Sequence, residues 1–238
     1  MNRWVKPLAA VLLLPLVLTA CLFLPGKFES TLTIHADRSF TFAYKGEVVA
    51  ADLEGAMGKT LSGMGESKDG GSEESNEPEE KPDPKKAAEE KAKKEAEYRE
   101  VAVQLAKEAG YRSVEYRGEG LFYVDYEISG VLTHNFVYPF DMDTQMIFPW
   151  LAIELRGKDV VRVKAPGFAK QDNSVNGMPM ASGEDKLDGT FTLVTDAEVV
   201  SQNEESGGTA AGGMRTFKWR VNARTDDPPM AVLKVKGL

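Results

Sequence analysis

Two carboxylates in one stretch of this chain have the residue type and spacing for acid–base chemistry. Asp125 and Glu127 alternate with larger side chains and share a face with Tyr123. Paired carboxylates can donate and accept protons during hydrolysis. The simpler interpretation is that they belong to the solvated face of a half-buried β-sheet. A carboxylate-dependent hydrolase is therefore an alternative, and we expect that the chain is not an enzyme.

Histidines are the next candidates, because imidazole is both a base and a common metal ligand. The chain has 2 histidines, His35 and His134. Asp141 and Asp143 follow His134, but this stretch lacks the glycine and the spaced carboxylates of a calcium loop. The sequence also lacks the GxSxG and SxxK nucleophile motifs and a glycine-rich nucleotide loop. We therefore predict no catalytic residue, no metal and no cofactor.

Aromatic residues crowd the segment NFVYPFDMDTQMIFPW, residues 135–150. Most aromatic side chains of a globular domain lie in its core. A half-polar segment broken by proline could instead form an exposed patch for a partner or an apolar ligand. If the domain has a binding site, we expect it here. The candidate residues are Phe136, Tyr138, Phe140, Phe148 and Trp150.

The single cysteine, Cys21, ends an apolar run near the N-terminus. Arg3 and Lys6 precede the run, and small residues precede the cysteine, which is the layout of an export signal. Residues 7–25 are also a charge-free run of 19 residues. About 18 such residues can span a bilayer, so an uncleaved membrane anchor is the alternative. Pro15 in the middle of the run disfavours that helix. Both interpretations export the chain from residue 28 onward.

The tetrapeptide LTAC, residues 18–21, resembles the lipobox of bacterial lipoproteins. This resemblance implies that residues 1–20 are a signal peptide, cut before the cysteine. It also implies that Cys21 carries a diacylglycerol and a further acyl group such as palmitate, which together anchor the chain stably. Leu22 stands where aspartate would favour inner-membrane retention. In a bacterium with two membranes, the resemblance therefore implies an outer-membrane anchor with the domain facing the periplasm.

The composition excludes some classes of partner and bond. The chain has 238 residues and a formal net charge of −8. Loss of Arg3 and Lys6 with the signal would leave −10, because residues 1–20 contain no acidic side chain. An acidic chain repels nucleic acid, so we exclude a nucleic-acid partner. Once Cys21 is lipidated, no thiol remains for a disulfide or a metal.

We expect one folded domain over residues 28–238, joined to the lipid by a tether at residues 21–27. The stretch that begins at Phe28 alternates around a polar turn and predicts a β-hairpin. Residues 66–86 have no apolar side chain larger than proline, which predicts a disordered interruption. Residues 84–109 predict a charged helix with an apolar stripe on its second half.

The remainder of the chain favours β-structure. Short alternating segments recur between Gly- and Pro-rich turns up to the C-terminus, as in FKWRV, residues 217–221. We count about seven or eight strands and one long helix by this pattern. The fold class is therefore α+β, with a mainly antiparallel sheet on which the helix packs.

Three stretches resemble the LppM-type bacterial lipoprotein domain. They are STLTIHADRSFTF, VVRVKAPGFAKQDNS and FKWRV, which lie between the lipidation site and the C-terminus. The resemblance implies an α+β lipoprotein of the cell envelope without known catalysis. It supplies no active-site residue to transfer to this chain.

From these observations we expect an exported, membrane-anchored lipoprotein whose domain binds or scaffolds a component of the cell envelope. Its partners would be the membrane, through the lipid on Cys21, and an envelope protein or an apolar ligand. The alternatives are an apolar-ligand carrier, an envelope hydrolase and a single-pass membrane protein. A carrier requires a large apolar pocket, and a hydrolase requires titratable groups that converge in one concave site.

Overall fold

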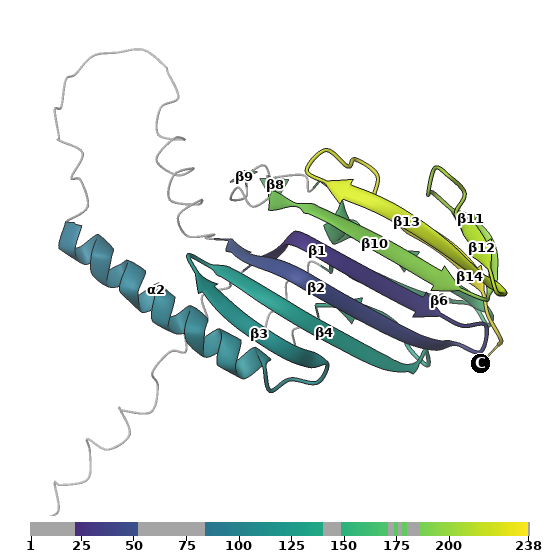
Figure 1. Ribbon diagram of the computed structural model, residues 1–238, viewed down its shortest axis with the longest axis horizontal. Helices are drawn as coiled ribbons and strands as arrows, with labels where there is room; N and C mark the ends of the chain where they lie inside the picture. The colour runs from purple at the N-terminus through teal and green to yellow at the C-terminus, as the bar shows by residue number, and fades with distance from the viewer. Residues whose placement is uncertain are drawn as a thin grey trace, which may run out of the picture.

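Two β-sheets face each other in the computed structural model, and one α-helix lies along the edge of the larger sheet (Figure 1). The structure describes residues 22–51, 84–139, 149–170, 174–175, 178–179 and 186–237. Within these ranges the strands form sheets of 7, 5 and 2 strands.

The seven-stranded sheet, sheet A, has the order β12-β13-β10-β1-β2-β4-β3. Its strands are β1 (Leu22–Ile34), β2 (Ser39–Ala51), β3 (Tyr111–Gly118), β4 (Leu121–Val131), β10 (Asp188–Thr195), β12 (Thr209–Ala211) and β13 (Met214–Asn222). Strands β1 and β10 are parallel, and the other neighbours are antiparallel. The parallel pair joins the N-terminal hairpin to the C-terminal third of the chain.

The five-stranded sheet, sheet B, has the order β11-β14-β7-β6-β5. Its strands are β5 (Phe136–Tyr138), β6 (Leu151–Arg156), β7 (Val160–Lys164), β11 (Glu198–Gln202) and β14 (Met230–Lys234). All its neighbours are antiparallel. The remaining elements are the short pair β8 (Ser174–Val175) and β9 (Met178–Pro179), the helix α2 (Pro84–Leu105) and the 3-10 turn η1 (Pro166–Phe168).

The β1–β2 hairpin follows directly from its alternating sequence. Phe28, Leu32 and Ile34 are buried, whereas the alternate residues point to the outer side. Asp37 accepts hydrogen bonds at its Oδ1 from the backbone N–H of Ser39 at 2.9 Å and from its hydroxyl at 2.7 Å. These bonds shape the turn that joins the two strands, and the predicted hairpin is confirmed.

Residues 22–27 are part of β1, which corrects the expected tether. Leu22 pairs with Ala51, and the pairing continues to Pro25 before the register shifts at a bulge. The sequence pattern is misleading here, because Pro-Gly usually ends a strand, whereas a bulge accommodates it within one. Gly46 lies opposite the bulge, where a Cβ atom would come within 2.4 Å of the Lys27 carbonyl oxygen.

The core lies between the two sheets and is rich in aromatic rings. Phe42 of β2 lies 5.0 Å from the Tyr138 ring of β5, and Tyr44 lies 5.2 Å from Trp150, measured between ring centroids. Phe28 stacks on Phe168 of η1 at 4.4 Å. Each of these contacts joins sheet A to the sheet B side, so one continuous core holds both sheets together.

Helix α2 packs through its C-terminal half. Tyr98 contacts the rings of Tyr116 and Phe122 at 5.7 and 5.8 Å, and Ala102 is buried. Residues 85–93 are exposed. The helix begins at Pro84, as expected, and ends at Leu105, before the expected Ala109. It ends early because bonds to residues three positions back tighten the chain after Leu105 toward the turn into β3.

The α+β class with a mainly antiparallel sheet is confirmed. The described strands outnumber the seven or eight expected and divide into facing sheets. Alternation along the chain shows which residues share a face of a strand, but it does not show which strands hydrogen-bond to one another. Most of the expected disordered segment lies outside the described residues.

Candidate functional site

The aromatic segment 135–150 contributes to the core in its described part. Tyr138 and Trp150 are each 3% exposed, and Phe136 is half-buried against Phe40 and Phe42. Phe140 and Phe148 lie outside the described residues. Tyr138 and Trp150 therefore cannot belong to an exposed patch, and the core interpretation holds for them.

Tyr138 is the centre of an aromatic cluster. Its ring lies 4.6 Å from that of Tyr126, 5.0 Å from that of Phe42 and 5.6 Å from that of Trp150. Burial raises the pKa of the Tyr138 hydroxyl well above its ordinary value. A phenol whose pKa is raised in this way stays protonated at neutral pH, so it acts as a packing group and a hydrogen-bond donor.

Trp150 also ties the start of sheet B to the start of β1. Its indole Nε1–H donates to the carbonyl oxygen of Phe23 at 3.1 Å. The Phe23 ring meets Phe122 edge-on at 5.5 Å. The first residues after Cys21 are therefore held by both a hydrogen bond and ring packing.

His35 pairs with a carboxylate at the end of the sandwich opposite the β1 start. Its Nδ1 lies 3.2 Å from Asp196 Oδ2, and the backbone N–H of Ala36 donates to Asp196 Oδ1 at 2.7 Å. The Ala36 hydrogen bond is the main cause of the lowered pKa of the Asp196 carboxyl. Ser39, the hydroxyl of this turn, donates instead to Asp37. The His35–Asp196 pair thus joins two turns. The Ser39 hydroxyl is bonded to Asp37 and not to His35, so these three groups do not form a nucleophile–base–acid arrangement.

His134 does not gather a metal site in the described structure. Its Nδ1 lies 3.1 Å from the hydroxyl of Thr133, and Asp141 and Asp143 lie outside the described residues. Among the residues that the structure describes, no three His, Cys, Asp or Glu side chains are grouped as metal ligands would be. The prediction that no metal binds stays a prediction.

The carboxylates of β4 are each paired with a cation from a neighbouring strand. Lys45 Nζ lies 3.4 Å from Asp125 Oδ2, and Arg112 Nη2 lies 2.5 Å from Glu127 Oε1. Both pairs lie on the outer side of sheet A, opposite the buried residues of β4. This arrangement matches the solvated sheet face that the sequence indicates.

A cluster on the outer side of sheet B escaped the sequence analysis. Arg156 donates to Glu154 Oε2 from Nε at 3.0 Å and from Nη2 at 2.5 Å. Arg162 donates to the same oxygen, with Nε at 3.0 Å, and Lys164 Nζ lies 3.6 Å from Oε1. The Arg162 bonds are the first cause that lowers the pKa of Glu154 to about 2. The sequence signal that could have revealed this cluster is the spacing of its charges. Glu154 and Arg156, and likewise Arg162 and Lys164, stand two positions apart and so share one face of a strand.

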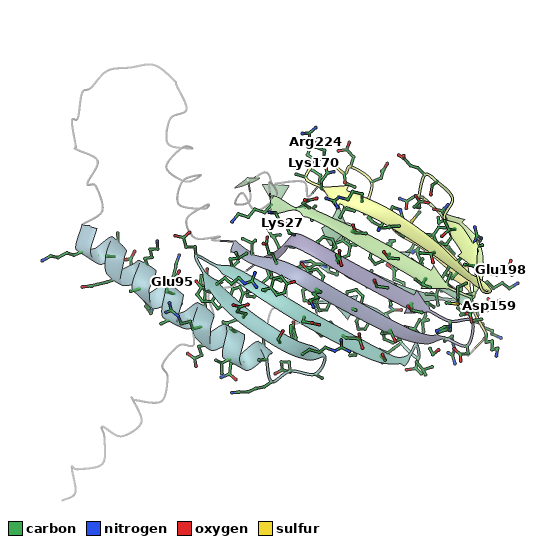
Figure 2. All side chains as sticks on the ribbon, viewed as in Figure 1. Lys27, Glu95, Asp159, Lys170, Glu198 and Arg224 are labelled. Atoms are coloured by element: carbon green, nitrogen blue, oxygen red, sulfur yellow. The ribbon has the colours of Figure 1, made fainter. Side chains whose placement is uncertain are left out.

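A shallow hollow of about 580 Å³ lies beside the end of β13. Its lining residues are Leu187, Asn222, Ala223, Arg224 and Thr225. The Lys170 backbone N–H donates to the Thr225 carbonyl oxygen at 2.7 Å, and Figure 2 shows the Lys170 and Arg224 side chains on the same side of the molecule. This mostly polar lining differs from the large apolar pocket that a lipid carrier requires.

Comparison with known proteins gave one structural likeness. No protein-family model matches the chain, and no curated protein matches it. The NMR structure of the folded domain of LppM from Mycobacterium tuberculosis aligns over 90% of this chain and 94% of its own, with 13% identity and a TM-score of 0.30. It is the same type of lipoprotein domain that the sequence motifs resemble. At that TM-score the likeness assigns neither a fold nor a function to this chain.

Within residues 22–51, 84–139, 149–170 and 186–237, no helix is both long enough and apolar enough to cross a bilayer.

Proposed function

We propose that the chain is an exported lipoprotein, anchored in the cell envelope by lipid on Cys21, whose β-domain is a non-catalytic binding or scaffolding module. The observation that carries the proposal is the start of β1 at Leu22, the residue that follows the lipobox cysteine. The folded domain and the proposed lipid are adjacent in the chain, so the lipid would hold the domain against the membrane surface without a spacer.

The beginning of β1 is fastened to the rest of the domain by strand pairing and by side-chain contacts. It pairs with the end of β2, from Leu22 opposite Ala51 to Pro25 opposite Val48. The Trp150 indole bonds the Phe23 carbonyl, and the Phe23 ring packs on Phe122. A lipid on the preceding residue would therefore be linked to both sheets through ordered backbone and side-chain contacts. Such a rigid connection suits a module that presents a fixed surface at the membrane.

The absence of catalysis is part of the proposal and is supported by the pairing of the candidate carboxylates. Asp125 and Glu127 each face a cation within 3.4 Å. These ion pairs lie on the outer side of sheet A, whereas a hydrolase requires titratable groups that converge in one concave site.

The location is proposed to be the outer membrane, facing the periplasm, if the cell has two membranes. The basis is Leu22, which stands where aspartate would favour the inner membrane. An envelope protein or an apolar ligand would be the partner of the module, besides the membrane itself.

The test is the intact mass of the protein extracted from membranes. Wild type is expected to have the mass of a chain that begins at Cys21 and carries two or three acyl chains. Cys21→Ala is expected to lack this species, because the thiol that accepts the diacylglycerol is gone. Thr19→Ser is the matched control, since it keeps a small residue near the cleavage site and is expected to be processed like wild type.

A full-length mass without acyl groups in both wild type and Cys21→Ala would overturn the lipoprotein proposal. It would support the uncleaved anchor instead, with residues 7–25 as the membrane segment.

A further inference from the structure

Four cations lie on the outer side of sheet B. Buried residues Ile153, Val161, Val163 and Leu233 alternate with them along three adjacent strands, so the cations point away from the core. We call this surface the basic face, and its cations are Arg156, Arg162, Lys164 and Lys234. The side chains of Arg156 and Lys234 are 57% and 53% exposed.

The basic face has more cations than acids. Arg156, Arg162 and Lys164 share one carboxylate, Glu154, and the fourth cation lies 4.0 Å from Glu198. On the outer side of sheet A, by contrast, each ion pair joins one cation to one acid. The pairs there are Lys45–Asp125, Arg112–Glu127, Arg117–Glu115 and Arg220–Asp188. The excess of positive charge therefore belongs to sheet B.

The net negative charge of the whole chain does not cancel the positive charge of the basic face. Residues 52–83 contain 10 acidic and 3 basic side chains, a net charge of −7 out of the −10 that remains after loss of Arg3 and Lys6. The rest of that chain therefore carries a net charge of only −3. Electrostatic forces between exposed charges fade over about 10 Å at ordinary ionic strength, so a local excess of cations governs contacts at the basic face.

The basic face begins beside the point where the lipid would be attached. Trp150, which directly precedes β6, reaches the Phe23 carbonyl, two residues after Cys21. Ala152 pairs with Lys164 near the start of β6, and Arg156 pairs with Val160 at its end. At about 3.3 Å per residue, β6 carries the face some 13 Å from Ala152 to Arg156. Lys164 lies toward the anchored end, whereas Arg156 and Lys234 lie toward the opposite end, where the Lys236 N–H donates to the Ala36 carbonyl oxygen. All four cations would therefore meet the bilayer that holds the anchor when sheet B lies along its surface.

We propose that the basic face docks on the anionic lipid headgroups of the membrane in which Cys21 is anchored. This inference rests on the proposed lipid anchor and names a second contact with the same membrane. The planar guanidinium groups of Arg156 and Arg162 suit phosphate oxygens, and the lysines add point charges. Docking fixes the domain with sheet B on the membrane and turns the outer side of sheet A toward solvent.

Lysine footprinting of the full chain tests this orientation. Cell membranes that contain the protein are treated with a membrane-permeant amine-acylating reagent, before and after solubilisation in a non-ionic detergent. Lys164 and Lys234 are expected to react several-fold more slowly in membranes than in detergent. Lys45 and Lys218, on the outer side of sheet A, are the internal controls and are expected to react at the same rate in both.

Vesicles of defined composition test whether anionic lipid headgroups are what the basic face binds. The detergent-purified full chain is reconstituted into phosphatidylcholine, alone or mixed with phosphatidylglycerol. Protection of Lys164 and Lys234 is expected in the mixed vesicles alone. It is expected to disappear at 1 M salt, where the screening length falls to about 3 Å.

A charge-removal variant tests the role of the cations themselves. In Arg156→Gln/Lys234→Gln, Lys164 remains as the probe. Each cation near an anionic surface favours docking about fivefold, so loss of two weakens the docked state roughly 25-fold and removes most of the protection at Lys164. The matched control, Lys45→Gln/Arg220→Gln, removes two cations from the outer side of sheet A. It is expected to retain the protection of Lys164.

The outcomes separate docking from anchoring. Equal reactivity of all four lysines in membranes and in detergent overturns the docking proposal. Protection that persists in detergent also overturns it, because a bound protein would then cover the face. The mass of the peptide that begins at Cys21, read from the same digest, reports the lipid separately. An acylated peptide together with unprotected lysines would support the lipid anchor and overturn the docking proposal.

Discussion

At the scale of residues, Glu154 shows how tertiary pairing changes the properties of a side chain. Its carboxylate is 23% exposed and receives hydrogen bonds from two arginines, which lower its pKa to about 2. Removing it leaves Arg156, Arg162 and Lys164 to repel one another. The carboxylate therefore serves to hold the basic face together rather than to exchange protons near neutral pH.

Replacement of Glu154 by glutamine is expected to lower the free energy of unfolding by about 1 kcal/mol at neutral pH. The folded pKa is below the ordinary value of 4.5. The stabilisation is therefore fully present above pH 4.5 and is lost as the pH falls toward 2. Urea unfolding followed by tryptophan fluorescence across this range measures the difference between wild type and Glu154→Gln.

The matched control is Glu198→Gln, at a carboxylate that is 71% exposed and 4.0 Å from its lysine. Its effect should stay within about 0.5 kcal/mol. A difference between wild type and Glu154→Gln that is the same at pH 4.5 and at pH 2 would contradict the assigned role.

At the scale of elements, the apolar contacts of helix α2 with sheet A are confined to the C-terminal half of the helix. Tyr98 lies against Tyr116 and Phe122, and Ala102 is buried nearby. The N-terminal half of the helix is exposed (Figure 1). Ion pairs spaced four residues apart, such as Lys93–Glu97 and Arg99–Glu95, support the helix only weakly. Its position therefore depends on a few side chains.

Truncation of Tyr98 to alanine is expected to release α2 from sheet A at a cost of about 2–3 kcal/mol. Hydrogen exchange measured by mass spectrometry should show faster exchange over residues 94–105, with strands β1 and β10 still protected. Val103→Ala is the control, because this valine is 56% exposed. Equal exchange in the two variants would indicate that Tyr98 does not fasten the helix.

At the scale of the whole molecule, the parallel contact of β1 with β10 unites the domain. Lys27 pairs with Asp188, and the register continues to Ile34 opposite Thr195. Residues more than 150 positions apart thereby form the centre of sheet A. The interruption predicted over residues 66–86 falls between β2 and α2 except for its last three residues, which begin α2. The disorder of residues 66–83 stays a prediction.

Replacement of residues 66–83 by a glycine–serine linker of equal length is expected to leave the unfolding temperature nearly unchanged. The reason is compositional, since the segment has no large apolar side chain to bury. Calorimetry on the full chain and on the variant measures the difference. A drop of more than about 4 °C, which corresponds to roughly 1 kcal/mol or more, would show that the segment packs on the domain.

The sequence by itself determined the local features of this protein. Alternation identified the β1–β2 hairpin and the faces of β4 and β13, because the side-chain period of a strand is visible in its own residues. Composition likewise indicated the charged helix near Pro84. The lipobox resemblance at Cys21 rests on four adjacent residues, and the mass measurement will decide it.

Only the tertiary structure decided which strands meet and which side chains share a surface. The β1–β10 pairing, the division into two sheets and the burial of Tyr138 and Trp150 depend on contacts between distant parts of the chain. The basic face has the same origin, since Glu154 and Arg162 come together through the β6–β7 register and Lys234 joins them from β14. Such long-range pairing is selected by the total burial of apolar surface, which no single segment reveals.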